Sequence, residues 1–431
     1  MPARARPPVT TSDPTPPSLW RDADFRRFWT GHTASQLGAQ TGQVILPLIA
    51  IVALGAESRQ VGVLRAVQQA PILLLSLFAG AWVDRRRSRT VMVLADVGRT
   101  VALAVIPVAF LLGVLDIPLL LLVAFLVGSL TVYFDVAYQT SLVRLVERDR
   151  LAHGNSVLEG SRSAAQIAGP ALGGALVSLL TAPIAILAGS FLFALSVLSI
   201  RRIRRPEPMP APAVRRVRRQ IHEGLRLVAG DASLRAVAIS SALFQFSFAA
   251  VMTVYLLFLP RTLHLPGAAI GLVLAAMGPG ALVGSLLSAR LPARYGHGVV
   301  LVSAAALGDG VLLCVPALHG SSTVTIAALM ALDFLFGVFS QLVDVTVVTV
   351  RQAITPVPIQ GRVVATMNFV GMGLTPLGSL LGGYLAAALG PRTSLLLTAA
   401  TPLLSPLFMA LSPLARLGRE LPGTASAPDR L

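Results

Sequence analysis

The chain has 431 residues, of which 55% are hydrophobic and only 13% are charged. Soluble domains carry about 25% charged residues, so this composition excludes an ordinary cytosolic enzyme, a coiled coil and a disordered chain. The net charge is +16, and all 35 basic residues are Arg. These Arg lie in short runs between apolar tracts, a pattern typical of membrane topology and not of nucleic-acid binding. The single cysteine, Cys314, excludes a disulfide framework and a Cys-based metal site.

Twelve apolar tracts are long enough to cross a bilayer, which takes roughly 20 residues. Pro183, Pro402 and Pro406 interrupt the sixth and the twelfth, as neighbouring helices in a bundle allow. The sequence therefore predicts an all-α integral membrane protein with twelve transmembrane helices. Their expected ranges are 28–54, 60–83, 90–113, 117–142, 160–181, 183–200, 236–259, 268–289, 298–318, 323–350, 363–389 and 394–415.

The arginines also predict the orientation. Residues 1–27 contain six Pro and five Arg and lack the apolar core of a signal peptide, so we expect a cytoplasmic tail. With this tail inside, the inner segments carry 30 of the 35 Arg. The outer segments carry four, and Arg99 lies within a span. Because Arg-rich loops stay on the cytoplasmic side, both termini are predicted to be cytoplasmic.

One long polar segment, 201–235, divides the spans into two sets of six. It is Arg- and Pro-rich, and we interpret it as a linker on anionic lipid in preference to a regulatory site. The expected domains are thus a tail (1–27), a first bundle (28–200), the linker (201–235), a second bundle (236–415) and a cytoplasmic C-terminal tail (416–431). A shift of 209 residues aligns parts of the two bundles, which predicts duplicated, pseudo-symmetric halves in parallel orientation. The aligned pairs include Gly62 with Gly271, Gly128 with Gly337, Asp135 with Asp344, and Gly173-Gly174 with Gly382-Gly383.

The segment after the second span reads GAWVDRRRSR over residues 80–89. It resembles the helix 2–3 loop of the major facilitator superfamily, G-x-L-a-D-r-x-G-r-r, through Gly80, Asp84, Arg85 and Arg89. Trp82 replaces the usual Leu, and Arg87 and Ser88 stand where Gly and Arg are usual. The resemblance implies a cytoplasmic gate latch, whose ion pairs differ between two states. The alternative is a plain cluster of cytoplasmic charge.

The fifth span contains GPALGG, in which Gly169, Pro170, Gly173 and Gly174 match a motif of exporting members of this superfamily. Small residues permit close helix contact, so this helix is expected to pack against helix 8. Generic packing of small residues is the alternative. Together with ADVGR and RQAITPVPIQGRV, the run resembles the drug-exporter branch that includes the enterobactin exporter and macrolide-efflux proteins.

Six ionisable residues fall inside or near the ends of spans, where they are costly and often functional. Asp96 and Arg99, three residues apart, can pair with each other, and we group them with the gate. Asp135 and Asp344 lie near the cytoplasmic ends of their helices, either as latch partners or as proton sites. Asp309 and Asp333 lie nearer the midplane, where a carboxyl group could carry a proton or form only neutral hydrogen bonds. The proton-coupling candidates are Asp135, Asp309, Asp333 and Asp344.

Polar residues at helical spacing form a stripe along the first span. In the superfamily, helices 1, 4, 7 and 10 line the central cavity, so polar residues on them are candidates for substrate contact. Interhelical hydrogen bonding is the alternative. The candidates are His32, Gln36, Gln40, Gln43, Tyr133, Tyr138, Gln139, Ser241, Gln245 and Gln341.

These features predict a proton-coupled exporter of amphipathic small molecules in the bacterial cytoplasmic membrane. Its partners would be the substrate, the proton and the lipid bilayer, with no nucleic acid, and a monomer is the expected state. The alternative is a facilitator or importer of a nutrient or lipid-like solute. The sequence shows no phosphate-binding G-x-x-x-x-G-K-[ST] loop and no catalytic motif, so we expect neither a cofactor, a metal nor an enzymatic activity.

Overall fold

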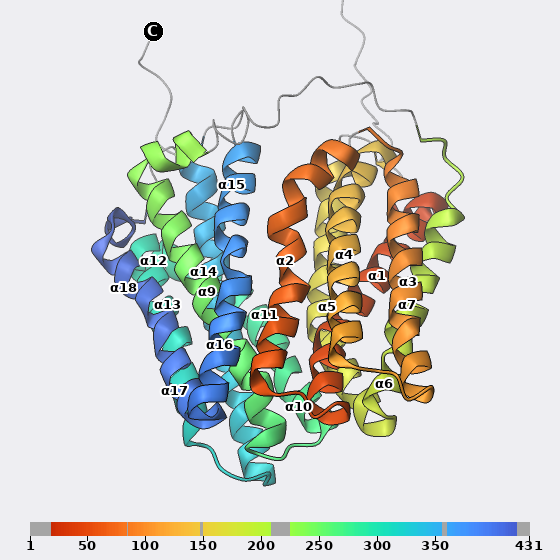
Figure 1. Cartoon of the computed structure of the whole chain (residues 1–431). Helices are drawn as coiled ribbons and strands as arrows, with labels where there is room; N and C mark the ends of the chain where they lie inside the picture. The colour runs from red at the N-terminus through yellow and green to blue at the C-terminus, as the bar shows by residue number, and fades with distance from the viewer. Residues whose placement is uncertain (1–18, 84, 147–149, 208–224, 356–359, 420–431) are drawn as a thin grey trace, which may run out of the picture.

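The computed structural model describes residues 19–83, 85–146, 150–207, 225–355 and 360–419. Within these ranges the regular structure is helical and forms two bundles side by side (Figure 1). The first bundle comprises α1 (Ala23–Leu48) with a π-helical end (Ile49–Ala53), α2 (Ser58–Val83), α3 (Ser88–Leu111), α4 (Ile117–Leu145), α5 (Leu151–Leu179), α6 (Ala182–Ala185) and α7 (Leu187–Arg201). A short 3-10 helix, η1 (Leu19–Arg21), precedes α1.

The second bundle repeats this plan with more interrupted helices. It comprises α9 (Ala232–Arg261), α10 (Gly267–Ala275), α11 (Met277–Ser288), α12 (Leu291–Tyr295), α13 (His297–Val311) with η4 (Leu312–Ala317), α14 (Thr323–Ile354), α15 (Gln360–Gly373), α16 (Thr375–Leu389), α17 (Pro391–Ala400), η6 (Thr401–Leu403), α18 (Leu404–Leu411) and η7 (Pro413–Arg416). Ten helical segments of the described chain are long and apolar enough to cross a membrane. With α2 and α5, of 26 and 29 residues, they make the predicted twelve passes.

Two of the three predicted proline interruptions are present, whereas Pro406 lies within the first turn of α18, which continues through it. Pro183 lies in the first turn of α6, which meets α7 at Ile186. Pro402 lies in η6, the 3-10 turn that separates α17 from α18. Proline lacks the amide hydrogen that an α-helix needs, so the helix tightens or breaks there.

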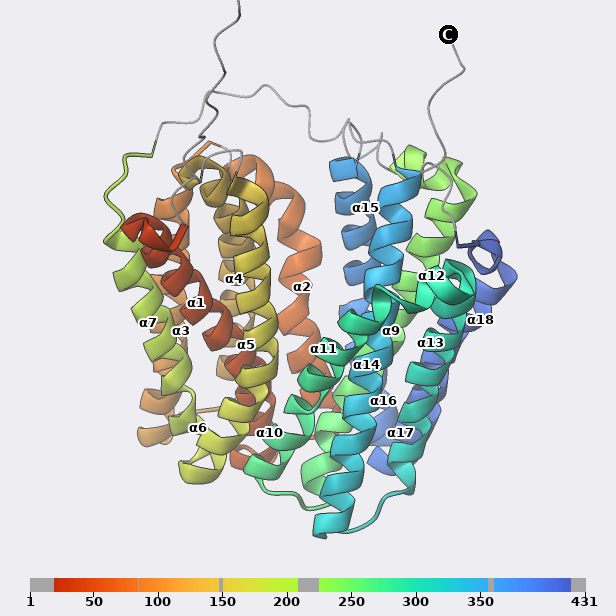
Figure 2. The ribbon, with the colours of Figure 1, turned by 180° about the vertical axis from the view of Figure 1, so that it is seen from behind.

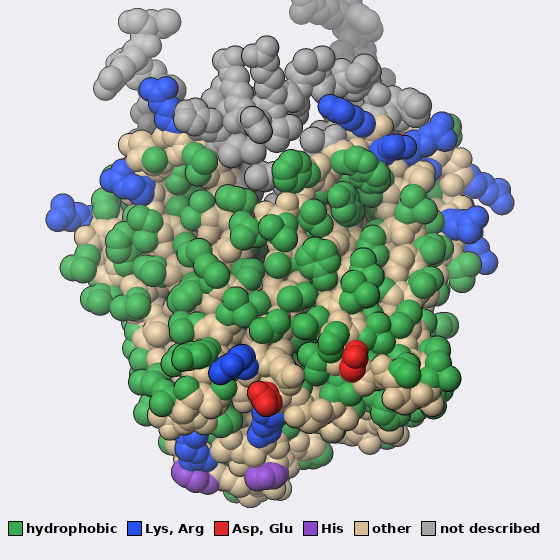
Figure 3. Space-filling model, viewed as in Figure 1, with side chains coloured by type: hydrophobic (Ala, Val, Ile, Leu, Met, Phe, Trp, Pro, Cys, Tyr) green, Lys and Arg blue, Asp and Glu red, His purple; other side chains and the backbone are tan. Residues whose placement is uncertain are grey.

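Both described chain ends lie toward the same side of the molecule, which is uppermost in Figure 1. We call this side the terminal face and the opposite side the far face. Between them, exposed apolar side chains form a broad band, visible in Figure 3, with most of the visible arginines above it. Phe78 and Leu286 are examples, each 71% exposed. Lipid chains can cover such a band, whereas a water-soluble monomer rarely exposes one of this extent.

The buried cores show where the halves meet. One core on the far side combines residues of both halves, among them Ile45 and Leu64 of the first and Leu257 and Ile270 of the second. Toward the terminal face the cores separate. One contains only first-half residues, and two others contain only second-half residues. The halves are therefore packed together at the far face and have independent interiors at the terminal face.

Polar contacts reinforce the far-face closure. Arg261 of α9 donates hydrogen bonds to the Ala56 carbonyl and, at 3.2 Å, to the Ser58 hydroxyl at the start of α2. The backbone amide of Ala268 donates to Ser178 Oγ at 2.5 Å. Figure 2 shows the second of these junctions from behind, where α10 lies beside the end of α5.

Candidate functional site

The glycine run of α5 packs as predicted against the eighth pass. A Cβ added to Gly174 would collide with the backbones of Gly267 and Gly271 in α10. Gly169 and Gly173 instead face α1, where they contact the backbone of Thr41. Because these glycines have no side chains, α5 can contact both α1 and α10 through its backbone. The run therefore supports the contact between the halves.

Arg99 is deeply buried in the first half, with 1% of its surface exposed. It forms an ion pair with Asp96, one turn earlier in α3, as their spacing suggested. Its guanidinium also donates hydrogen bonds to Ser35 Oγ at 2.9 Å and to Thr131 Oγ1 at 3.3 Å. These four residues, the Arg99 network, join α1, α3 and α4. Burying these charges is costly without such partners, although Asp96 Oδ2 and Arg99 Nε have none among the described residues.

Two aromatic rings complete the surroundings of Arg99. The guanidinium carbon lies 4.6 Å from the centre of the Phe134 ring and 4.3 Å from that of Phe193. A planar guanidinium can stack on aromatic faces in a way that an ammonium cannot. This arrangement adds α7 to the helices that the network holds together. It lies inside the first bundle, and its predicted participation in the gate stays a prediction.

Asp135 lies beside this network on α4. Gln36 of α1 donates a hydrogen bond to its Oδ1 at 3.3 Å. Asp135 also lies within electrostatic range of Arg99 and of Arg162 on α5. We expected Arg85 or Arg89 as latch partners, but the contacts of Asp135 in the described structure run to α1.

Glu207, a residue that the sequence reasoning overlooked, occupies the predicted latch region. Its carboxylate accepts hydrogen bonds from the backbone amides of Ser88 at 2.7 Å and Arg89 at 3.1 Å. Amides in the first turn of a helix have no carbonyl partner within that helix. Glu207 satisfies two such amides at the start of α3, where a negative charge is also favourable. Arg144 of α4 forms an ion pair with the same carboxylate at 2.8 Å. The sequence signal that could have identified Glu207 is an acidic residue between prolines in an Arg-rich segment.

The predicted latch acid, Asp84, lies outside the described residues, as does the side-chain environment of Gly80. Arg85 is exposed. Arg89 reaches the start of the linker instead, where its side chain donates a hydrogen bond to the Arg205 carbonyl. The described part of the loop is thus held by residues 205–207.

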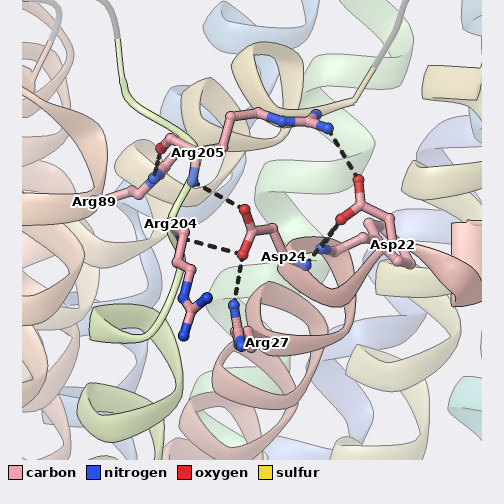
Figure 4. Close-up of polar contacts among 7 residues, drawn as sticks. Asp22, Asp24, Arg27, Arg89, Arg204 and Arg205 are labelled. Carbon is pink, nitrogen blue, oxygen red and sulfur yellow. Dashed lines mark hydrogen bonds and ion pairs between the residues drawn. The ribbon is translucent and has the colours of Figure 1, made fainter.

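The start of the linker is clasped onto α1 (Figure 4). Asp24 accepts hydrogen bonds from the backbone amides of Arg204 at 3.1 Å and Arg205 at 2.9 Å, and pairs with Arg27 at 2.9 Å. The Arg205 side chain pairs with Asp22 at 3.2 Å. We call these five residues the linker clasp. It fixes the beginning of the linker to the first half.

Two carboxyl groups are buried in the second half. Asp333 of α14 is 4% exposed and accepts a hydrogen bond from the Tyr255 hydroxyl of α9, which lies 3.2 Å from both carboxylate oxygens. It borders a small pocket whose other walls are mainly aromatic and aliphatic, with Phe248 and Phe336 stacked at 5.4 Å. Asp309 of α13 is 3% exposed, and its Oδ2 has no hydrogen-bond partner among the described residues.

Asp344 differs in its exposure from the other proton-coupling candidates. It is exposed near the terminal end of α14 and lies within electrostatic range of Arg351 on its own helix. It is also within range of Arg162, which belongs to α5 of the other half. The symmetry-related residues Asp135 and Asp344 therefore face the same arginine from opposite halves.

The predicted substrate residues fall into distinct environments. His32 is fully buried, and its ring centre lies 4.4 Å from that of Tyr138, which is also buried. Tyr133 packs edge-on against Trp82 at 5.4 Å. In this conformation these three side chains lie between helices, and their role in substrate contact stays a prediction.

The other candidates are more accessible or pack elsewhere. Gln43 and Gln139 are exposed, whereas Ser241 and Gln245 are partly exposed. Gln40 packs against Gly169 of α5, and Gln341 packs against Gly284 of α11. Gln36, as described above, is bound to Asp135. Within the described ranges, His, Cys, Asp and Glu side chains form no cluster of three or more suited to a metal ion.

Comparisons with known proteins agree with this arrangement. The family described as transmembrane secretion effector matches residues 15–427. The multidrug efflux pump Tap of Mycolicibacterium fortuitum is 27% identical over 339 residues, which cover 76% of this chain and 80% of Tap. A bacterial homologue of the human lysosomal transporter Spinster, in an inward-facing and occupied conformation, superposes with a TM-score of 0.74 at 14% identity. That superposition covers 93% of this chain and 98% of the homologue.

A second solved structure leads to the same fold. A bacterial homologue of the iron transporter ferroportin, in an inward-facing state, gives a TM-score of 0.73 at 17% identity and covers 91% of this chain and 99% of its own. The family match covers almost the whole chain. The two bundles and their far-face junction agree with it. This chain belongs to the transmembrane secretion effector family of the major facilitator superfamily and is a multi-pass membrane transporter.

Proposed function

We propose that this transporter is a proton-coupled exporter of amphipathic small molecules, which works by alternating access with its terminal face toward the cytoplasm. The excess of Arg at the terminal face supports this orientation. The relationship to a multidrug efflux pump supports the direction and the class of substrate. The packing of the halves supports the mechanism.

In the proposed cycle the described conformation is the one that receives substrate from the cytoplasm. The far-face core and the glycine contacts close the path to the outside. The separate cores at the terminal face leave the halves free to move apart there. Export requires the reverse arrangement, in which the terminal ends meet and the far-face contact opens.

The buried Asp333–Tyr255 pair is the observation that carries the coupling proposal. The carboxyl group lies among apolar and aromatic side chains, and the described structure gives it a hydroxyl partner but no basic one. A carboxylate in such a place is costly, and taking up a proton removes that cost. Tyr255 can remain hydrogen-bonded in both protonation states, because its hydroxyl can donate to a carboxylate or accept from a carboxylic acid.

Asp135 is the second coupling candidate. Its surroundings differ, because it already has a hydrogen bond from Gln36 and lies near two arginines. Such neighbours stabilise its charged form. We therefore place the proton carrier in the second half at Asp333, and keep Asp309 and Asp344 as further candidates to be tested.

The test uses inside-out vesicles that contain a pH-sensitive dye and are energised to a stable proton gradient. A panel of lipophilic cations, macrolides and siderophores is added to the wild type and to Asp333→Asn, Asp135→Asn and Asp309→Asn. We expect at least one compound to release protons in the wild type, and Asp333→Asn to abolish that release. Asp116→Asn is the matched control, since Asp116 is an exposed helix cap and Asn caps equally well.

Two results would contradict the proposal. Substrate exchange that proceeds at the same rate with and without a gradient, and with no proton release, indicates a facilitator. Proton release that survives in Asp333→Asn but disappears in Asp135→Asn assigns coupling to the first half instead.

A further inference from the structure

Arg65 occupies a special place on α2. Gly62, one turn nearer the far face, packs against Gly383 of α16. Gln69, one turn nearer the terminal face, accepts a hydrogen bond from Ser379 of α16 at 3.4 Å. Arg65 therefore lies between two contacts of α2 with α16, on the terminal side of the Gly62 contact.

The helical spacing shows which way Arg65 is directed. Arg65 shares one flank of α2 with Val61, which is 0% exposed, and with Gln68, since these positions are four and three residues away. Leu74 lies nine residues further, half a turn around the helix, and is 54% exposed. Phe78, one turn beyond Leu74, is 71% exposed. Arg65 therefore lies on the flank of α2 opposite the exposed Leu74 and Phe78.

Arg65 is a partly buried cation, and the described residues provide it with no counter-ion. Among the described residues no carboxylate pairs with it, and its buried Nε has no hydrogen bond. The neighbouring Gln68 Oε1 is likewise buried without a partner. Arg99, by contrast, pairs with an aspartate and donates to two hydroxyls, although its own Nε also lacks a partner. The Arg65 Nε and the Gln68 Oε1, one helical turn apart on α2, are thus both without a partner among the described residues.

A guanidinium does not lose its proton in a protein, so Arg65 stays charged whatever its surroundings. An unpaired buried charge is costly unless an opposite charge offsets it. The guanidinium fork fits two oxygens of a carboxylate, sulfonate or phosphate at once. The amides of Gln68 and Gln69 carry further N–H donors for the same group.

We infer that Arg65 binds an anionic group of the transported molecule, with the apolar body of that molecule lying among the surrounding helices. This inference rests on the proposed transport function and narrows its substrate class to amphipathic anions or zwitterions. Arg65 acts here as a binding residue that determines specificity. Proton coupling at Asp333 is a separate matter and does not depend on it.

The test measures equilibrium binding of two fluorescent probes to the purified full chain in phosphatidylcholine nanodiscs, with empty nanodiscs subtracted. The probes are 8-anilinonaphthalene-1-sulfonate and N-phenyl-1-naphthylamine, which share their rings and differ by the sulfonate. We expect Arg65→Gln to weaken sulfonate binding by about 10-fold or more, because a charge-assisted contact is lost. Binding of the neutral probe should change less than about twofold, which also reports that the variant is folded.

Two further variants complete the experiment. Arg65→Lys keeps the charge but not the fork, so its sulfonate affinity should fall between those of the wild type and Arg65→Gln. Arg59→Gln is the matched control, because Arg59 lies at the far end of the same helix over the Tyr384 ring. We expect it to bind both probes as the wild type does. If Arg65→Gln does not yield folded protein, the Lys variant decides.

Three results would overturn the inference. Equal loss of both probes in Arg65→Gln and Arg65→Lys indicates a structural role for the arginine. No change with either probe shows that the arginine does not reach the ligand. Displacement of the sulfonate by about 10 mM inorganic phosphate assigns the site to a small inorganic anion. Since binding requires no proton gradient, failure here leaves the proton-release test unaffected, and the reverse also holds.

Discussion

Gly62 of α2 approaches Gly383 of α16 so closely that a Cβ on Gly62 would lie 2.7 Å from the Cα of Gly383. The 209-residue shift maps Gly62 onto Gly271 and Gly174 onto Gly383. Gly174 and Gly271 also touch, between α5 and α10. The far-face closure therefore consists of two equivalent backbone contacts, one on each side of the pseudo-symmetry axis. Each half contributes one glycine to each contact.

A methyl group at either contact should weaken the far-face closure. In Gly62→Ala the new Cβ meets backbone atoms of α16, which cannot turn aside as a side chain could. We expect substrate transport to fall by about 10-fold or more, as an imbalance of 1.4 kcal/mol between the two states would produce. Ala56, which is 2% exposed at the far face, should become reactive when changed to Cys in a Cys314→Ser background.

The control for this experiment is Gly42→Ala, because nothing lies within 4 Å of a Cβ at Gly42. It should leave transport and labelling at wild-type levels, or slightly stabilise α1. If Gly62→Ala transports normally and its far face stays unreactive, the glycine contact does not control closure.

The Glu207 contacts make a second prediction. Glu207→Gln removes the charge that Arg144 and the start of α3 share, and Glu207 is only 5% exposed. We expect a loss of about 1–3 kcal/mol, seen as a lower melting temperature of the purified protein. Glu159→Gln is the control, since the Glu159–Arg162 pair is about half exposed and should contribute little.

A double-mutant cycle separates the stability that comes from the Glu207–Arg144 ion pair from the stability that comes from the hydrogen bonds of Glu207 at the start of α3. If Glu207 acts mainly through Arg144, Arg144→Gln and the double variant should be destabilised about as much as Glu207→Gln. Additive losses would show instead that the cap on α3 and the ion pair contribute independently. No loss in Glu207→Gln would remove Glu207 from the stabilising network.

The fold was predictable because hydrophobic tracts and repeated small residues are strong signals in a membrane chain. The twelve passes, the breaks at Pro183 and Pro402, and the contact of the Gly174 region with the eighth pass are all present. The lipid-facing surface must be apolar over a fixed length, so length and hydropathy suffice to find it.

The polar contacts were harder to predict because they join distant parts of the chain. Glu207 and Ser88 are 119 residues apart, and no local spacing connects them. His32 was placed on a polar stripe by its spacing, but its ring is fully buried and packs against Tyr138. Arg65 was counted among the arginines of the outer segments, whereas the structure places it inside α2, between Gly62 and Gln69.

The proposed orientation makes a third prediction. In a Cys314→Ser background, Asp116→Cys places a thiol at the far face and Arg87→Cys places one at the terminal face, and both positions are exposed. A membrane-impermeant maleimide added to intact cells should label the first and leave the second unlabelled. Permeabilised cells, in which both should react, provide the control. The opposite pattern would place the terminal face outside.

The Arg99 network makes the last prediction, which concerns stability. Arg99→Ala leaves Asp96 buried without its partner, and we expect a loss of about 3–5 kcal/mol. Arg99→Lys should also destabilise, because an ammonium cannot stack between Phe134 and Phe193 as a guanidinium does.

The informative variant replaces both charges at once. Asp96→Leu combined with Arg99→Met leaves no unpaired charge and keeps an apolar volume between the two rings, so its melting temperature should lie well above that of Arg99→Ala. A structural network predicts that this double variant also transports. If it folds and melts like the wild type but does not transport, the buried pair takes part in the transport cycle. The hydrogen bonds of Arg99 to Ser35 of α1 and Thr131 of α4 are then where movement between the two states is expected.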